Sequence, residues 1–264
     1  MTEPAPVTLT QDGPVARVTL NRPEIHNAFD EALIAALAET FTGLAEDPAA
    51  RVVVLAGAGR SFSAGADLNW MKRAAAYDEE RNREEARAME AMFRAIDDCP
   101  KPVIAAVHGA AIGGGVGLVA ACDIAIASDA AVFATSEVRL GIVPAVIAPF
   151  VIRAIGPRAA RRYFLTAERF DAAEALRIGL VHETVPPDRL EFRVAEIAAE
   201  LLKGGPLAQA EAKRLVRLVG MMPQGGSILA EHTIAMIAER RASDEGREGI
   251  GAFLEKRKPG WGER

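Results

Sequence analysis

Hydrophobic and polar residues follow two different periods along the first two thirds of the chain. Residues Val15–Leu20 alternate between the two kinds, which predicts a strand with one buried face. Ala28–Leu44 has its large apolar residues at helical spacing, and Glu79–Ile96 is a charge-rich helix. Three short runs are almost wholly apolar, as in parallel strands covered on both faces: Arg51–Ala56, Val103–Val107 and Asp123–Ala127. The order of these segments predicts an α/β protein.

From residue 147 onward the pattern predicts helices almost exclusively. These helices are expected over Pro157–Thr166, Ala172–Leu176, Leu190–Leu202, Pro206–Val219, Ile228–Arg241 and Glu245–Lys256. The change divides the chain into an α/β core with the active site (residues 1–195) and a helical C-terminal region (residues 196–264). This region is too small and too amphipathic for a separate domain, so we expect it to pack on the core or on a neighbouring subunit.

Composition narrows the class of protein. The 264 residues are 50% hydrophobic and 25% charged, with a formal net charge of −5. This profile excludes wholesale disorder and disfavours binding to nucleic acid through its phosphates. Cys99 and Cys122 form no Cys-x-x-Cys pair, the N-terminus has no secretory pattern, and no apolar run reaches the ~20 residues of a membrane span. We therefore expect a cytoplasmic protein with unpaired thiols.

Two loops combine a preceding strand, small residues and a helix start. They are Arg60–Leu68 and the glycine-rich His108–Leu118. Glycines allow the backbone to approach a ligand, and a helix that starts in such a loop directs free N–H groups toward it. Two facing loops can each donate one N–H group to the same oxygen. That arrangement is an oxyanion hole, which stabilises an enolate or a tetrahedral oxyanion.

Other interpretations of these loops have less support. Gly113 and Gly115 weakly match a dinucleotide-binding loop, but Leu118 stands at the third glycine position. No Gly-Lys-Ser/Thr follows, and Ser61 and Ser63 lack the flanking glycines of a nucleophile elbow. The glycines of the second loop could also serve only close helix–strand packing. No His or Cys cluster has metal-ligand spacing, so no metal site is predicted.

The chain resembles the enoyl-CoA hydratase/isomerase (crotonase) family over nearly its whole length. The two loops carry this resemblance together with further motifs in the same order and spacing. These are Asn21-Arg22-Pro23, Cys122-Asp123-Ile124, Glu137-Val138-Arg139-Leu140-Gly141-Ile142-Val143-Pro144, Ala173-Glu174-Ala175, Gly179-Leu180-Val181 and Phe253-Leu254-Glu255-Lys256-Arg257. Each motif alone is weak, but the set is specific.

The resemblance implies a fold, an assembly and an oxyanion hole. The fold is a ββα superhelix with a helical C-terminal trimerisation region, in a homotrimer or a dimer of trimers. The oxyanion hole would consist of the backbone N–H groups of Ala66 and Gly114, which would hold the thioester oxygen of an acyl-CoA substrate. Coenzyme A belongs to the substrate, and no separate cofactor is implied.

Hydratases of this family use two glutamates to hold and activate one water molecule. Glu137 matches one of them, while Gly117 stands at the helix position of the other. The chain therefore keeps one acid/base carboxylate. We expect the missing side chain to leave room for a longer or branched acyl group. Burial in an acyl pocket should raise the pKa of Glu137.

Within the family, the sequence resembles a bacterial methylglutaconyl-CoA hydratase-like subgroup linked to leucine and terpenoid breakdown. Its substrates are branched, carboxylated enoyl-CoAs such as 3-methylglutaconyl-CoA. Arg139 could meet the extra carboxylate, or it could form a structural ion pair. The remaining substrate-binding residues implied by the resemblance lie in the loops, after Asn-Arg-Pro and near the C-terminus: Ala64, Gly65, Asp67, Leu68, Gly113, His26, Phe253 and Lys256.

Three functions follow from this resemblance. The leading one is an enoyl-CoA hydratase in which Glu137 is the acid/base group. A Δ3–Δ2 enoyl-CoA isomerase is the second, because a single carboxylate suffices to move one proton between two carbons. A non-catalytic acyl-CoA binder is the third, although Glu137 and both loops are intact. Incorporation of water distinguishes the first from the second.

Overall fold

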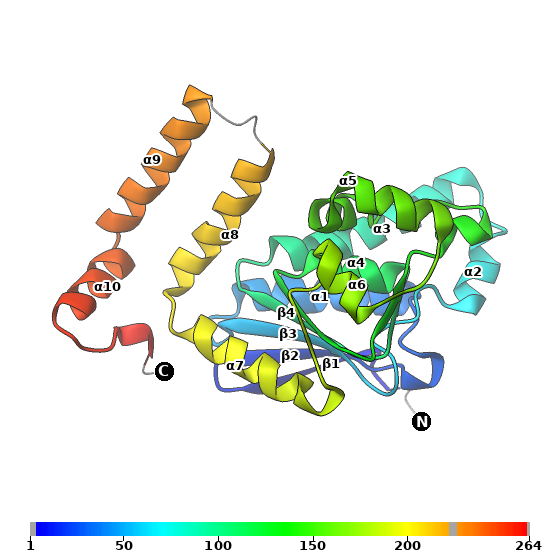
Figure 1. Ribbon diagram of the computed structural model, residues 1–264, viewed down its shortest axis with the longest axis horizontal. Helices are drawn as coiled ribbons and strands as arrows, with labels where there is room; N and C mark the ends of the chain where they lie inside the picture. The colour runs from blue at the N-terminus through cyan, green and yellow to red at the C-terminus, as the bar shows by residue number, and fades with distance from the viewer. Residues whose placement is uncertain (1–3, 222–225, 263–264) are drawn as a thin grey trace.

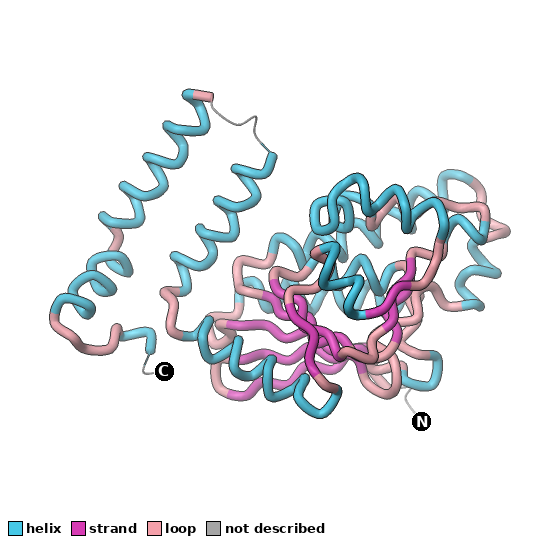
Figure 2. The backbone as a smooth tube through the Cα atoms, viewed as in Figure 1, coloured by secondary structure: helices cyan, strands magenta, loops and turns pink. Residues whose placement is uncertain are grey.

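The computed structural model describes residues 4–221 and 226–262. Its main sheet has six strands in the order β1-β2-β3-β4-β6-β9. Strands β1 to β4 lie side by side in Figure 1, and Figure 2 shows the strands in magenta. All neighbouring strands pair in parallel except β1 with β2. The strands are β1 (Val7–Asp12), β2 (Val15–Leu20), β3 (Val52–Gly57), β4 (Val103–Val107), β6 (Ile124–Ser128) and β9 (Glu183–Val185).

A smaller sheet of three strands stands beside the main one. Its order is β5-β7-β8, with β5 (Ala110–Ile112) parallel to β7 (Val132–Ala134) and β7 antiparallel to β8 (Phe170–Asp171). Strand β5 directly follows the end of β4 and leads into helix α4 (Gly114–Ala121). The second glycine-rich loop therefore lies where the chain passes from the main sheet to the small sheet.

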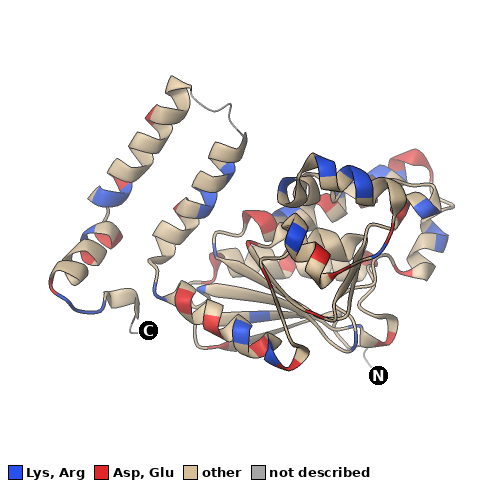
Figure 3. Ribbon diagram, viewed as in Figure 1, with Lys and Arg blue, Asp and Glu red and all other residues tan. Residues whose placement is uncertain are grey.

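Helices cover both faces of the main sheet, as the apolar strands require. On one face, α7 (Leu190–Leu202) packs its residues Leu190, Val194 and Ala198 against β3, β4 and β6. The larger core lies on the other face, under α1 (Glu31–Glu46), α3 (Glu79–Asp98) and α4. Charged residues of both signs lie mainly on the helices, whereas the central strands are largely uncharged (Figure 3).

The remaining helices complete the core and build a C-terminal extension. Those on the core are α2 (Leu68–Ala74), α5 (Ala148–Thr166) and α6 (Ala172–Ile178). The extension consists of α8 (Pro206–Met221), α9 (Ser227–Ala242) and α10 (Asp244–Leu254), which project from one end of the core (Figure 1). Short 3-10 helices span Pro23–Ile25, Glu137–Leu140, Pro187–Arg189 and Gly260–Gly262.

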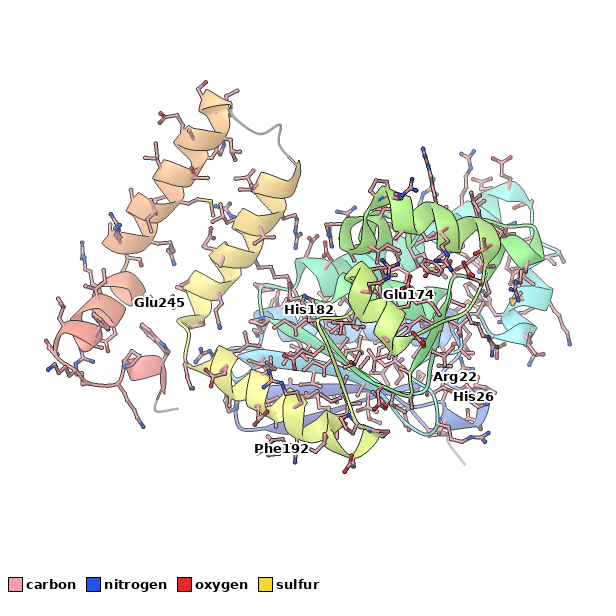
Figure 4. The ribbon with its side chains drawn as sticks, viewed as in Figure 1. Arg22, His26, Glu174, His182, Phe192 and Glu245 are labelled. Atoms are coloured by element: carbon pink, nitrogen blue, oxygen red, sulfur yellow. The ribbon has the colours of Figure 1, made fainter. Side chains whose placement is uncertain are left out.

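Polar contacts hold the extension to the core and to itself. Lys213 of α8 forms an ion pair of 2.7 Å with Asp123, which precedes β6. The Glu245 carboxylate of α10 accepts hydrogen bonds from the N–H groups of Leu207 and Ala208, so it caps the N-terminus of α8 (Figure 4). The expected boundary after residue 195 falls inside α7, which belongs to the core. The helical extension begins at α8.

Most expected elements are present. The short strands β5, β7, β8 and β9 and helix α2 were not expected, and two further differences have physical reasons. Strand β1 was not expected, because it is an edge strand whose residues are mostly exposed and follow no buried alternation. Helix α5 begins at Ala148 rather than at Pro157. Gly156 (φ +71°) kinks this helix just before the proline, so the sequence showed only its second half. Within the described residues, none of the helices has the length and apolar character needed to cross a membrane.

Candidate active site

The two loops singled out in the sequence lie side by side. Ser63 N donates to Ala110 O (2.9 Å), and Ile112 N donates to Ser63 O (2.9 Å), so the first loop pairs with β5 as a short parallel bridge. Gly109 has a φ of +59°, and a Cβ there would lie 2.0 Å from Arg60 O. Glycine is therefore required where the two loops come closest.

The side chain of the buried residue Asn27 holds the first loop in place through hydrogen bonds. The side-chain nitrogen of Asn27 donates to the carbonyl oxygens of Ser61 (2.8 Å), Ala58 (2.9 Å) and Phe62 (3.2 Å). Its side-chain oxygen accepts from Arg22 N (2.9 Å). Asn27 lies four residues after the Asn-Arg-Pro motif and was not predicted as a functional residue. A polar residue between a turn signal and an apolar helix was the only available signal.

The residues expected to form the oxyanion hole have free N–H groups. Phe29 N donates to Gly65 O (2.6 Å) and Asp67 N donates to Phe29 O (2.8 Å), which leaves the N–H of Ala66 between them without an acceptor among the described residues. Gly114 is the first residue of α4, and its N–H likewise has no described acceptor. Both residues line the same cavity. Each can therefore donate to a bound oxygen.

The ring of Phe29 leaves no room for a side chain at position 114. A Cβ on Gly114 would lie 2.1 Å from Cε2 of Phe29, whose side chain is fully buried. The preceding Gly113 adopts φ +53°, and a Cβ there would lie 3.1 Å from Glu137 Oε1. Because both residues lack a side chain, the backbone can lie close to Phe29 and to the Glu137 carboxylate.

Glu137 lies in the wall of this cavity, which has a volume of about 310 Å³. One carboxylate oxygen, Oε2, is buried and has no hydrogen-bond partner among the described residues. Burial raises the pKa of Glu137, as expected, because the charged form loses hydration. The cavity thus holds a carboxyl group that is suited to proton transfer. The two free N–H groups of Ala66 and Gly114 line the same cavity.

The cavity contains a second carboxyl group that the sequence analysis missed. Glu85 of α3 lines it together with Asn82, Ala86 and Met89 of the same helix. Trp70 of α2 also lines the cavity, and its Nε1 donates to Glu85 Oε2 at 3.0 Å. The dense charges of this helix hid an acidic residue that faces the cavity.

The expected widening of the pocket at Gly117 is wrong. A Cβ on Gly117 would lie 2.4 Å from Cγ2 of Ile147 and 2.9 Å from the ring of Phe93. Gly117 is buried and is absent from the lining of the cavity. The side chains of Ile147 and Phe93 therefore occupy the space of the missing glutamate.

Other expected binding residues lie around or outside the cavity. Ala64 and Gly65 line it. Asp67 caps α2 by accepting from the N–H groups of Asn69 and Trp70, and Leu68 beside it is exposed. His26 is half-buried, and its Nδ1 lies 3.0 Å from Ser61 Oγ at the outer side of the first loop, next to Arg22 (Figure 4).

Three expected residues lie away from the cavity lining. Arg139 is exposed, and it forms no ion pair with any residue of the described segments. The structure thus supports neither of the two roles weighed for it. Phe253 (82% exposed) and Lys256 lie at the end of the extension.

The described part of the chain holds no group of three or more His, Cys, Asp or Glu residues that could bind a metal ion.

Two free N–H groups and a buried carboxyl group around one apolar cavity define an α/β enzyme equipped to stabilise an oxyanion and to move a proton. The chain belongs to the enoyl-CoA hydratase/isomerase family, whose family model matches residues 10–264.

Relatives extend the likeness over nearly the whole chain. Crotonyl-CoA hydratase of Syntrophomonas wolfei is 34% identical over 258 residues, which cover 96% of each chain. The structure of an enoyl-CoA hydratase from Shewanella pealeana superposes with a TM-score of 0.93 at 41% identity, over 97% of this chain and 96% of that one. Pseudomonas aeruginosa AtuE gives a TM-score of 0.93 at 39% identity, over 98% and 100%. These likenesses confirm the expected fold.

Proposed function

We propose that this protein adds water across the α,β double bond of a short enoyl-CoA thioester, or removes water in the reverse reaction. The observation that carries the proposal is the buried oxygen of Glu137 that has no partner in the described parts of the chain and lies in the cavity that Ala66 and Gly114 also line. The names of the relatives support the same chemistry, since they include hydratases of enoyl-CoA and crotonyl-CoA.

The proposed mechanism assigns one task to each group. The N–H groups of Ala66 and Gly114 bind the thioester oxygen and stabilise the negative charge that it acquires when Cα becomes enolate-like. Glu137 transfers a proton to or from Cα. Burial disfavours the ionised form of Glu137, which suits donation of a proton during hydration. The reaction needs no cofactor beyond the coenzyme A of the substrate.

The lining of the cavity supports an acyl group that ends in apolar atoms. It is formed largely by apolar side chains of α2, α3 and the segment after Glu137, among them Met71, Met89 and Val143. Its ionisable residues within the described chain are both acidic, namely Glu85 and Glu137. A carboxylated acyl group such as 3-methylglutaconyl would meet two acidic side chains and none of the described cations. We therefore favour acyl groups without a carboxylate, such as 3-methylcrotonyl, over the carboxylated 3-methylglutaconyl group.

Isomerisation of a Δ3 double bond is the second candidate. It is favoured by the filled space at Gly117, which removes the usual position of a second glutamate. An isomerase moves the double bond without taking up water. Measuring the uptake of labelled water oxygen into the product separates the two reactions.

We further propose that the extension serves assembly into a homotrimer or a dimer of trimers. Large apolar side chains are exposed along α8, α9 and α10: Leu207, Val216, Ile228, Ile234, Ile237, Ile250, Phe253 and Leu254. Contact with neighbouring subunits would remove them from water. Phe253 and Lys256 would then be placed near the coenzyme A of a neighbour. Light scattering coupled to size exclusion measures the mass, and a monomer would contradict this proposal.

The test follows the absorption of the conjugated thioester for crotonyl-CoA, 3-methylcrotonyl-CoA and 3-methylglutaconyl-CoA. The last two differ by one carboxylate, so they test the acyl assignment as a matched pair. Glu137→Gln is expected to lower turnover by about 10²–10⁴-fold. Glu79→Gln, which removes an exposed acid paired with Arg83, is the control. The proposal would be contradicted if Glu137→Gln kept the wild-type turnover, or if the enzyme hydrated none of the three substrates.

A further inference from the structure

Glu85 differs from the other acidic residues of α3 that form ion pairs. Glu79, Glu84 and Glu90 are each paired with an arginine of the same helix. Glu85 forms no ion pair with a described residue, and it accepts a hydrogen bond from the indole of Trp70 instead. Glu80 also has no ion pair among the described residues, but it is exposed, whereas Glu85 is half-buried against Trp70. Burial beside the cavity is therefore what sets Glu85 apart.

Helical spacing places Glu85 on the face of α3 that borders the cavity. The lining residues of this helix are 82, 85, 86 and 89, which recur at intervals of three and four residues. Trp70, buried on the neighbouring α2, donates its N–H to Oε2 of Glu85 at 3.0 Å. This bond fixes the carboxyl group, and it leaves Oε1 as the free oxygen.

The free oxygen of Glu85 lacks a donor. Oε1 is buried without a hydrogen-bond partner among the described residues, and Glu137 Oε2 is in the same state. Both residues line the one cavity. A buried acceptor without a donor costs free energy, so two of them in one cavity require donors that enter with the ligand or the solvent. A water molecule supplies two O–H donors.

We propose that Glu85 is the second catalytic carboxylate of the hydration reaction, and that Trp70 is its positioning residue. The inference rests on the proposed hydratase function. Glu85 accepts one proton from the water molecule while the water oxygen forms a bond to Cβ. The electron pair of the double bond moves toward the thioester oxygen, and Cα then takes its proton from Glu137. The substrate gains one water molecule in all, and a proton exchange between the carboxyl groups and solvent restores the enzyme.

This assignment accounts for the loss of the helix glutamate. Gly117 cannot be replaced by a larger residue without displacing Ile147 and Phe93. An acid from α3 reaches the same cavity from another element. The chain therefore retains two carboxyl groups at the site, although only one stands at a family position.

The experiment separates two steps of the reaction. Hydration of crotonyl-CoA requires both carboxyl groups, whereas exchange of the Cα hydrogens of butyryl-CoA in D2O requires only Glu137 and the oxyanion hole. Glu85→Gln is expected to lower hydration by about 10²–10⁴-fold and to keep the exchange rate within about threefold. Glu137→Gln is expected to lose both activities. Glu85→Asp, which keeps a carboxyl group, should recover part of the hydration.

Two further variants complete the design. Glu84→Gln removes an adjacent acid paired with Arg81 and should leave both activities unchanged. Trp70→Phe removes the indole donor and should lower hydration more than exchange. The inference is overturned if Glu85→Gln hydrates crotonyl-CoA at the wild-type rate, or if it loses exchange and hydration equally. Failure of the wild-type enzyme to hydrate any enoyl-CoA refutes the proposed function itself.

Discussion

The side-chain nitrogen of Asn27 donates a hydrogen bond of 2.8 Å to the carbonyl oxygen of Ser61, 34 residues along the chain. The same nitrogen reaches the carbonyl oxygens of Ala58 and Phe62. One buried amide thus closes the turn after β3 and holds the loop that carries Ala66. The position of a candidate oxyanion donor depends on a residue that does not line the cavity.

Replacing Asn27 with alanine should destabilise the fold by about 2–4 kcal/mol, because buried carbonyl groups lose their donor. Urea unfolding measures this loss. Asn69→Ala, at an exposed position of α2, should change the free energy of unfolding by less than about 0.5 kcal/mol. An equal effect of the two substitutions would show that the Asn27 bonds do not hold the loop.

Gly114→Ala should impair activity more than stability. Its Cβ would lie 2.1 Å from Phe29, so the N–H group of residue 114 must shift. Loss of one oxyanion donor lowers turnover by about 10²–10³-fold. Gly43→Ala is the control, since its Cβ meets nothing within 4 Å on the exposed side of α1, and it should stabilise the helix slightly. Steady-state hydration assays compare the two variants, and an active Gly114→Ala enzyme would exclude residue 114 from the oxyanion hole.

The central strands β2, β3, β4 and β6 and the cavity backbone could be predicted because their signals are local. Apolar runs predict buried strands, and the glycines of the second loop, such as Gly109 and Gly114, mark close backbone approach. The position of Gly117 shows the limit of this reasoning. An absent side chain predicts a space, but only the packing of Ile147 and Phe93 shows that the space is filled. Glu85 was missed for the same reason, because its burial depends on contacts between α2 and α3.

The raised pKa of Glu137 predicts how stability varies with pH. In the unfolded chain this carboxyl group ionises in its usual range, whereas burial delays ionisation in the folded protein. The unfolded state therefore binds fewer protons within that window, and stability falls as pH rises through it. The wild type should lose stability relative to Glu137→Gln between about pH 4 and about pH 8. Urea unfolding at both values gives the difference, and a constant difference would contradict the desolvated state of Glu137.

Gly117→Ala tests whether the missing glutamate leaves a cavity. If Ile147 and Phe93 fill the space, the added methyl group overpacks the core and should cost about 1–3 kcal/mol. Ile147→Ala removes the nearest obstacle, so the same substitution should cost less in that background. A double-mutant cycle of unfolding free energies measures the coupling. Additive effects would mean that Ile147 does not restrict position 117, and a second acid could then be introduced on α4. Coupling of more than about 0.5 kcal/mol would show that Ile147 occupies the space beside position 117.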